Sequence, residues 1–215
     1  MSFESYRTIL FECSGEITEK KSRFIATLAP VSSEEEAVAV ITNLKKKYWD
    51  ARHNCSAYII AAEEADGIDI EKCSDDGEPS RTAGMPMLDI LRNENLKNVV
   101  VVVTRYFGGI LLGTGGLVRA YQAATKAGIE AAETGVTREL LRIRITTDYN
   151  GYGRLEALAS KNGFSIDNTV FTDKVSSLVL CEENEFESIS SKMTEATAGQ
   201  SLIEKLDKVR KTMKE

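Results

Sequence analysis

The sequence predicts an α+β fold with two domains, and three observations support this prediction. Five consecutive valines, Val99–Val103, indicate a strand covered on both faces, because β-branched side chains suit a strand and an unbroken apolar run suits a doubly buried one. A glycine-rich segment follows and leads into apolar residues with helical spacing, so this stretch predicts strand, loop and helix. After Thr134–Thr137 the pattern restarts as strand, helix, two strands and helix, which is typical of a ferredoxin-like domain (β-α-β-β-α-β).

Before the valine strand, the pattern predicts three strands and two helices. A turn around Ser14-Gly15 is expected to join the first two strands, since glycine commonly marks turns. Residues 32–35 have the composition of a capping box that opens the first helix. The helix after the glycine-rich segment is expected to stop at Gly135. The strands are residues 7–13, 16–28 and 51–60, and the second helix opens at residues 82–86.

The second domain is expected to open with a strand at residues 140–147. A helix follows and stops at Gly163, and a hairpin turns around Thr172-Asp173. Asn184 and Glu187 are expected to cap the second helix of this domain.

The last segment is ambiguous between helix and strand. Its apolar residues recur at helical spacing, whereas a strand at residues 200–206 would complete the ferredoxin-like sheet. We place the domains at residues 1–135 and 138–207 and expect a charged, frayed tail at 208–215. The apolar residues with helical spacing are Leu202, Leu206, Val209 and Met213.

Composition indicates a soluble, cytoplasmic protein. Of its 215 residues 42% are hydrophobic, no apolar run approaches the ~20 residues of a membrane-spanning helix, and the N-terminus lacks a signal pattern. The four cysteines are scattered without a C-x-x-C pair, which argues against a zinc or redox motif. The net charge of −6 restricts any nucleic-acid contact to a local patch.

The glycine-rich segment is the first candidate binding site. Each glycine costs backbone entropy on folding, so five in one loop suggest positive φ angles or a group that approaches the backbone closely. An arginine in the first turns of a helix gains nothing from the helix dipole, so Arg119 is expected to face a partner. The candidate residues are Arg105, Tyr106, Phe107, Gly108, Gly109, Gly113, Gly115, Gly116 and Arg119.

The spacing of this segment excludes two familiar nucleotide motifs. A P-loop needs a lysine after its last glycine, and none follows Gly113–Gly116. A Rossmann loop needs a third glycine where Val118 stands. ATP and NAD are therefore not expected, and we expect no cofactor.

The loop Ser74–Ser80, which we call the acidic loop, is a second candidate site, because Asp75, Asp76 and Glu78 surround one glycine. Three interpretations are open. The loop can be a polar turn whose Asp side chains accept local backbone N–H groups, a surface for a partner, or a site for Mg²⁺ or acid–base chemistry.

His53 is the only histidine, and in the expected strand it shares a face with Cys55. This spacing suggests a Cys–His nucleophile pair. The alternative, which we prefer, is a packed and hydrogen-bonded histidine, because no acid or amide is placed to orient the imidazole.

Several motifs, found in the same order, resemble those of the IMPACT (YigZ-type) family. They are Lys21–Ile25, Ala51–Tyr58, Asp75–Ser80, Thr82–Gly84, Val103–Gly109, Leu112-Gly113 and Gly115–Tyr121. The match spans residues 1 to about 135, and the C-terminal part resembles the smaller domain of bacterial members. The resemblance implies an N-terminal domain like the second domain of ribosomal protein S5, and a ferredoxin-like domain similar to one in elongation factor G. Arg81 departs from the small residue expected at its position.

The resemblance also implies a translation-related or nucleic-acid-binding role. Eukaryotic relatives regulate translation by competing for the activator of the kinase that phosphorylates initiation factor two. That role is not carried over, because this chain lacks the RWD-type domain of the eukaryotic proteins.

The sequence is compatible with two functions. The first is a non-enzymatic binding protein that contacts RNA, the ribosome or a translation-related protein, with Arg105 and Arg119 as electrostatic anchors and Tyr106 and Phe107 as stacking surfaces. The alternative to a binding surface in this segment is that the glycines only allow close packing and that Arg105 forms an ion pair with the acidic loop. The second function is a hydrolase or phosphotransfer enzyme that uses His53 and the acidic loop, with Mg²⁺. The lack of an activated nucleophile favours binding.

Overall fold

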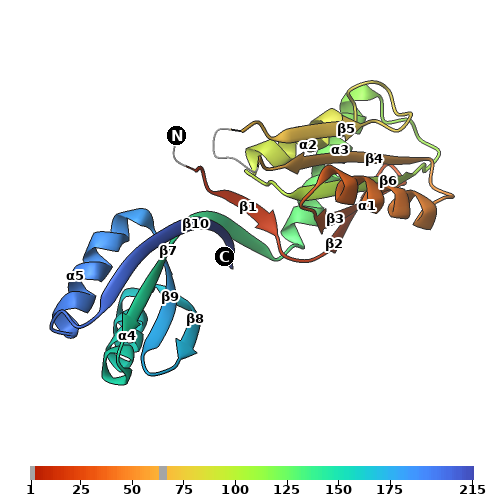
Figure 1. Ribbon diagram of the computed structural model, residues 1–215. Helices are drawn as coiled ribbons and strands as arrows, with labels where there is room; N and C mark the ends of the chain where they lie inside the picture. Colours follow the sequence, from red (N-terminus) through yellow and green to blue (C-terminus); the bar gives the residue numbers. More distant parts are fainter. Residues whose placement is uncertain (1–2, 63–66) are drawn as a thin grey trace. The chain divides into compact units, whose positions relative to one another are not determined.

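The computed structural model describes residues 3–62 and 67–215, so residues 1–2 and 63–66 lie outside the described part (Figure 1). Among the described residues, no helix has the length and the apolar character needed to cross a membrane.

The chain folds into two compact α+β units. Unit 1 comprises Met1–Thr137 and Thr212–Glu215, and unit 2 comprises Arg138–Lys211. The prediction of a two-domain α+β chain is therefore confirmed.

Unit 1 is built on a five-stranded sheet whose central strand is β6 (Val99–Tyr106). The strand order is β2-β3-β6-β4-β5, and every neighbouring pair is antiparallel. The other strands are β2 (Cys13–Glu19), β3 (Ser22–Pro30), β4 (His53–Ile60) and β5 (Ile70–Ser74).

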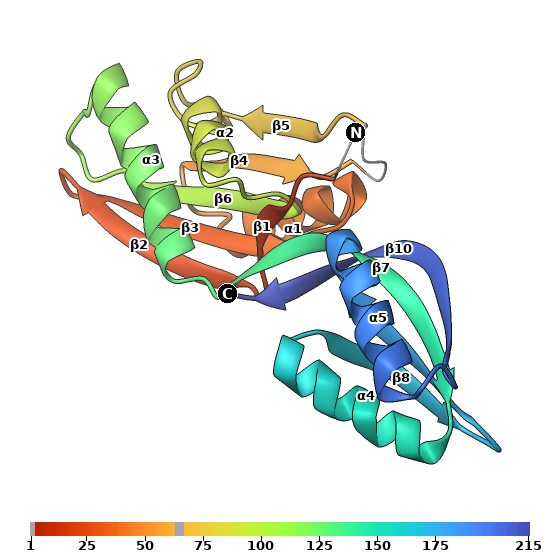
Figure 2. The ribbon, with the colours of Figure 1, turned by 90° about the vertical axis from the view of Figure 1, so that its left-hand side faces the viewer.

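Helices cover both faces of this sheet (Figures 1 and 2). Val99, Val101 and Val103 pack with residues of two helices, α2 and α3, whereas Val100 and Val102 pack with residues of α1. The valine run is therefore buried on both faces, as predicted. The helices are α1 (Glu34–Lys47), α2 (Gly84–Asn93) and α3 (Thr114–Glu130).

The turn between the first two strands of this sheet lies elsewhere than predicted. Lys20 and Lys21 form it, with φ angles of 44° and 65°, which are typical of a two-residue hairpin turn. Gly15 lies inside β2, where a Cβ atom would come within 2.3 Å of the Ala127 carbonyl oxygen on α3. The glycine serves close packing of helix on strand, so the turn expected at Ser14-Gly15 is wrong.

Gly135 was expected to end the helix that precedes it, and this expectation is wrong. Helix α3 ends at Glu130, and Gly135 lies in the next strand, β7 (Thr134–Thr147). The start of β7 pairs with β1 (Tyr6–Ile9), which places the boundary segment inside a sheet. A Cβ atom at Gly135 would lie 2.8 Å from the Met213 carbonyl oxygen, so close strand packing explains this glycine as well.

Unit 2 has the predicted ferredoxin-like order of elements. Strand β7 pairs with β9 and β10, and β9 pairs with β8, while α4 and α5 contribute to the core. The helix stop at Gly163 and the hairpin around residues 172–173 are confirmed. The elements after β7 are α4 (Tyr149–Asn162), β8 (Ser165–Phe171), β9 (Val175–Cys181), a 3-10 turn η1 (Glu183–Glu185), α5 (Phe186–Ala196) and β10 (Leu202–Lys214).

The capping residues of the second helix in this unit differ from the prediction. The capping box is formed by Glu182 and Glu185 around the 3-10 turn, ahead of α5. Asn184 lies within this turn, and Glu187 lies in the first turn of α5. The sequence offers several acids in a row here, and only backbone geometry decides which of them caps.

The final segment is a strand, and the predicted frayed tail at 208–215 is wrong. Strand β10 runs to Lys214, and its charged side chains form ion pairs across to β7. Asp207 Oδ1 lies 2.6 Å from Arg142 Nη2, and Lys208 Nζ lies 3.1 Å from Glu139 Oε2. Such cross-strand pairs stabilise a sheet, and the spacing of apolar residues along the sequence does not predict them.

The substitution Gly15→Ala tests the close packing of α3 on β2. Its Cβ would overlap the α3 backbone, so we expect the free energy of unfolding to fall by about 1–3 kcal/mol in urea denaturation followed by circular dichroism. Gly153→Ala is the matched control, because a Cβ there meets nothing within 4 Å. A helical Gly→Ala change should raise stability by up to ~1 kcal/mol, so equal effects of the two substitutions would contradict this packing role.

Candidate functional site

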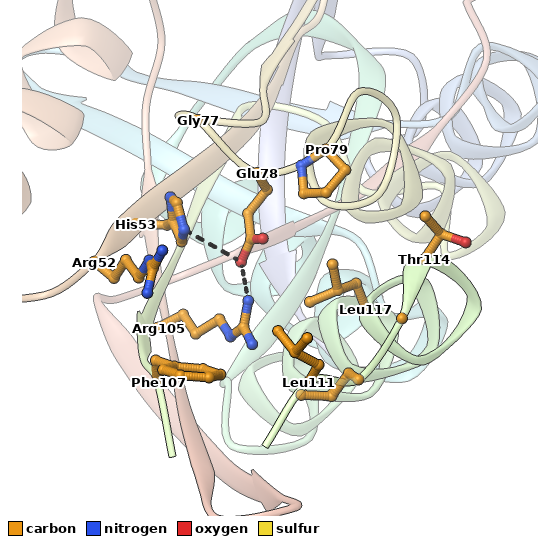
Figure 3. Close-up of a pocket in the computed structure, with 12 residues that line it drawn as sticks. Arg52, His53, Gly77, Glu78, Pro79, Arg105, Phe107, Leu111, Thr114 and Leu117 are labelled. Carbon is orange, nitrogen blue, oxygen red and sulfur yellow. Dashed lines mark hydrogen bonds and ion pairs between the residues drawn. The ribbon is translucent and has the colours of Figure 1, made fainter. Parts of the chain in front are cut away.

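A pocket of about 360 Å³ lies in unit 1 between the end of β6, the acidic loop and the start of α3 (Figure 3). Its polar residues point toward one another from separate elements, namely His53 on β4, Glu78 on the acidic loop and Arg105 on β6. We call it the Arg105 pocket. Its lining residues are Arg52, His53, Gly77, Glu78, Pro79, Arg105, Phe107, Leu111, Leu112, Gly113, Thr114 and Leu117.

The Glu78 carboxylate is buried and has polar neighbours on three elements. Its Oε1 accepts hydrogen bonds from Arg105 Nη1 at 2.5 Å and from the Tyr121 hydroxyl at 2.8 Å, and lies 3.9 Å from His53 Nε2. Glu78 is 8% exposed and Arg105 is 5% exposed, so little water screens their attraction. Arg105 therefore pairs with the acidic loop inside the protein, which was one of the two predicted alternatives.

Arg105 has donor capacity that its contacts within unit 1 leave unused. Its Nη1 donates to Glu78, whereas Nε is buried and has no hydrogen-bond partner among the described residues. The guanidinium carbon lies 5.3 Å from the ring centroid of Phe24 and 5.7 Å from that of Phe107, which is the range of cation–π attraction. Arg105 is thus held in a defined place in the pocket wall and is not an exposed anchor.

The hydrogen bonds of His53 and Cys55 go to the backbone of the acidic loop. His53 Nδ1 lies 2.8 Å from the Asp76 carbonyl oxygen, and since a carbonyl only accepts, Nδ1 carries the proton. The Cys55 thiol donates to the Asp75 carbonyl oxygen at 3.0 Å, and burial raises the pKa of this thiol far above its ordinary value. A thiol of this kind is a poor nucleophile near neutral pH. The packed, hydrogen-bonded histidine is therefore the better description.

Asp75 organises the backbone of the acidic loop. Its Oδ2 accepts the N–H of Arg81 at 2.7 Å, and its Oδ1 accepts the N–H groups of Ala83 at 3.0 Å and Gly84 at 2.8 Å. Arg81 itself has a left-handed φ of 63°. These contacts match the polar-turn interpretation, and Asp75 ties the loop to the start of α2.

Asp76 ties the same loop to β4 and α1. Its Oδ2 accepts the Asn54 N–H at 2.7 Å, and its Oδ1 lies 2.6 Å from Lys45 Nζ. Burial acts to raise the pKa of the Asp76 carboxyl, but the Lys45 ammonium and the Asn54 N–H outweigh it and hold this pKa below its ordinary value. Within residues 3–62 and 67–215, no three His, Cys, Asp or Glu side chains are grouped to hold a metal ion.

The glycines of the predicted binding segment have different structural reasons, which are close packing at some positions and a positive φ angle at others. A Cβ atom on Gly108 would lie 2.0 Å from the backbone of the β2–β3 turn, and one on Gly116 would lie 3.0 Å from Leu112 Cβ. Gly109 and Gly113 have φ angles of 84° and 71°. Gly115 meets neither condition, because its φ is not in the left-handed range and the nearest atom to a Cβ would be an Arg119 nitrogen at 3.7 Å.

The structure brings part of the predicted binding set into the pocket. Phe107 lies there beside Arg105 and Gly113. Arg119 is exposed on α3, and the Tyr106 hydroxyl donates to Asp50 at 2.9 Å. Of the nine predicted residues, the six outside the pocket lining are Tyr106, Gly108, Gly109, Gly115, Gly116 and Arg119.

Sequence reasoning missed the apolar wall of the pocket and one of its arginines. Leu111 and Leu112 lie between the glycines, and Leu117 has the spacing of a helix core residue, so each has an ordinary interpretation. The Arg52 guanidinium lies 5.4 Å from the Phe107 ring centroid. In the sequence, Arg52 lies next to His53 and within the family-like motif Ala51–Tyr58, but nothing there marked it as a site residue.

Comparisons with known proteins match both units. The family model of the Impact N-terminal domain matches residues 20–129, and that of a domain of unknown function, DUF1949, matches residues 145–200. "IMPACT family member YvyE" of Bacillus subtilis is 43% identical over 200 residues, which cover 93% of this chain and 90% of that protein. "Protein IMPACT" of Mus musculus is 42% identical over 99 residues, which cover 45% of this chain and 30% of that protein. The crystal structure of a hypothetical protein has a TM-score of 0.58 at 30% identity and covers 95% of this chain and 98% of that chain.

The substitution Arg105→Ala tests the buried pair. It would leave the Glu78 carboxylate buried without its cation, so we expect the free energy of unfolding to fall by about 3–5 kcal/mol. Arg119→Ala is the control, because removal of an exposed arginine should change stability by less than about 0.5 kcal/mol. Both are measured by urea denaturation, and an Arg105→Ala protein as stable as the control would show that the pair contributes little.

Proposed function

Since the chain belongs to the IMPACT family, we propose that it is a translation-related regulator that binds its partner and does not act as an enzyme. The family resemblance supplies the link to translation. The murine relative is matched over 30% of its length, so the activity of that whole protein is not transferred. The partner class that we propose is RNA, presented alone or on the ribosome.

Gly115 is the observation that carries the proposal of a binding surface. It lies in the first turn of α3 and is exposed, and a Cβ atom there would make only an ordinary contact, with an Arg119 guanidinium nitrogen at 3.7 Å. A helical glycine costs roughly 0.5–1 kcal/mol relative to alanine, and neither packing nor backbone angle requires one here. A partner that closely approaches the backbone of this turn would explain it.

The groups around Gly115 suit an anionic partner. Arg119 is exposed on the same helix, with one guanidinium nitrogen 3.7 Å from the place of a Gly115 Cβ. The N-cap residue is Gly113, which has no side chain to accept a hydrogen bond, so the first N–H groups of α3 lack a side-chain cap. Helix N-termini and arginines are common phosphate ligands, which favours an RNA backbone as the contact.

The contacts of the acidic loop weigh against the hydrolase or phosphotransfer alternative. Asp75 accepts three backbone N–H groups, Asp76 is paired with Lys45, and Glu78 is paired with Arg105. Each carboxylate thus has a structural use, and none is left over for acid–base work. These contacts support a binding protein.

Removal of Arg119 should weaken binding to ribosomes in a salt-dependent way. In cosedimentation with bacterial ribosomes over a KCl series, we expect the Arg119→Ala protein to show a plot of log K against log salt that is shallower by about 1, because one phosphate contact is lost. Lys46→Ala is the control, since Lys46 is exposed on α1, which packs on the opposite face of the sheet. The same affinity and slope for wild type and Arg119→Ala would refute the RNA contact at this helix.

Gly115→Ala should separate stability from binding. We expect the free energy of unfolding to stay the same or rise by up to ~1 kcal/mol, because alanine is the better helix former. Ribosome binding should fall, because the added methyl group occupies the space that the partner needs. Gly153→Ala, in open space on α4, should give the same gain in stability with unchanged binding. Unchanged binding by Gly115→Ala would contradict close approach at this turn.

A further inference from the structure

We infer that the interior of the Arg105 pocket binds a small organic anion, with a phosphate or carboxylate head and an apolar body about the size of a benzyl group. This goes beyond the proposed function, because it concerns a ligand of the protein alone and does not need a macromolecular partner. Three features of the pocket carry the inference, and they are its charge, its unsatisfied donor and its apolar wall.

The charged side chains of the pocket leave an excess of positive charge. Arg52 and Arg105 contribute two guanidinium groups, and Glu78 contributes one carboxylate. His53 places its Nε2 on the Glu78 side of the pocket, 3.9 Å from Glu78 Oε1. The pocket therefore retains one uncompensated cation, which favours an anionic ligand.

The start of α3 adds to this excess. Gly113 and Thr114 line the pocket, and they begin a helix of 17 residues that has no side-chain cap. The N-terminus of such a helix carries roughly half a positive charge and presents free N–H groups. Phosphates and carboxylates bind to helix ends of this kind.

Arg105 supplies the independent sign of a ligand. It is 5% exposed, it lines the pocket, and its Nε has no hydrogen-bond partner among the described residues. Buried guanidinium donors without a partner are costly, so each such donor calls for an acceptor. An anionic oxygen in the pocket would lie beside the guanidinium that Glu78 and Phe107 hold in place.

The rest of the lining sets the character of the ligand body. Phe107, Leu111 and Leu117 form an apolar wall next to the charged groups (Figure 3), and Leu112 also lines the pocket. A volume of about 360 Å³ is at the small end of the range for ligand pockets. The combination fits a molecule with one anionic end and one ring or short branched chain.

The inference is tested by calorimetric titration of the full chain with four probes. Phenyl phosphate and phenylacetate carry both parts of the ligand, inorganic phosphate carries only a head, and benzyl alcohol carries only the body. At least one of the first two should bind at least about tenfold more tightly than both partial probes, which corresponds to ~1.4 kcal/mol. Tight binding of one alone supports the inference and identifies the head group.

Two substitutions in the loop before α3 locate the site. Leu111 is 82% exposed and lines the pocket, so Leu111→Glu should leave the fold intact and weaken binding of the tighter probe at least about tenfold by charge repulsion. Ile110→Glu is the matched control, because Ile110 is also exposed and lies outside the lining. It should change binding by less than about threefold.

A direct readout is the NMR signal of the Arg105 Nε–H group, which should shift when the probe is added. Three outcomes would overturn the inference. They are binding no tighter than that of benzyl alcohol or inorganic phosphate, equal weakening by Leu111→Glu and Ile110→Glu, and an Arg105 Nε–H signal that does not move at saturation.

Discussion

The carboxylate of Glu78 is the point on which the organisation of the candidate site depends. It lies on a loop, yet it accepts hydrogen bonds from β6 through Arg105 and from α3 through Tyr121, and it lies near His53 on β4. A buried carboxylate is costly to desolvate, so it is stable only while these neighbours surround it. The contacts of Glu78 thus couple the position of the acidic loop to that of the sheet and of α3. The Arg105 pocket forms where the loop, the sheet and the helix meet.

Much of the fold could be predicted from sequence pattern. The valine strand, the helix after the glycine loop and the elements of unit 2 follow from apolar periodicity, which reports local burial. Two of the errors share one cause, because glycine suggests a turn or a helix end, while Gly15 and Gly135 permit close contact with a segment far along the chain. The strand β10 was obscured for a related reason, since its partners on β7 lie more than sixty residues away in sequence.

The candidate site was predictable in its chemistry and not in its geometry. The acidic loop and Arg105 were both singled out, but which acid pairs with Arg105 depends on the hairpin and helix that place Glu78 over β6. Asp75 and Asp76 looked equally available, and backbone N–H groups of neighbouring segments engage them. Leu111 and Arg52 became part of the pocket only through tertiary contacts that no local pattern encodes.

The two ends of the described chain both belong to unit 1, and this has a consequence for the order of events during synthesis. Arg7 Nε lies 3.2 Å from Glu215 Oε2, and the Glu215 N–H donates to the Thr134 carbonyl oxygen. These contacts can form only after residue 215 has left the ribosome, long after the rest of unit 1 has emerged. Residues 138–211 are therefore synthesised between two parts of unit 1, and the nascent chain can complete unit 1 only once residues 212–215 have emerged.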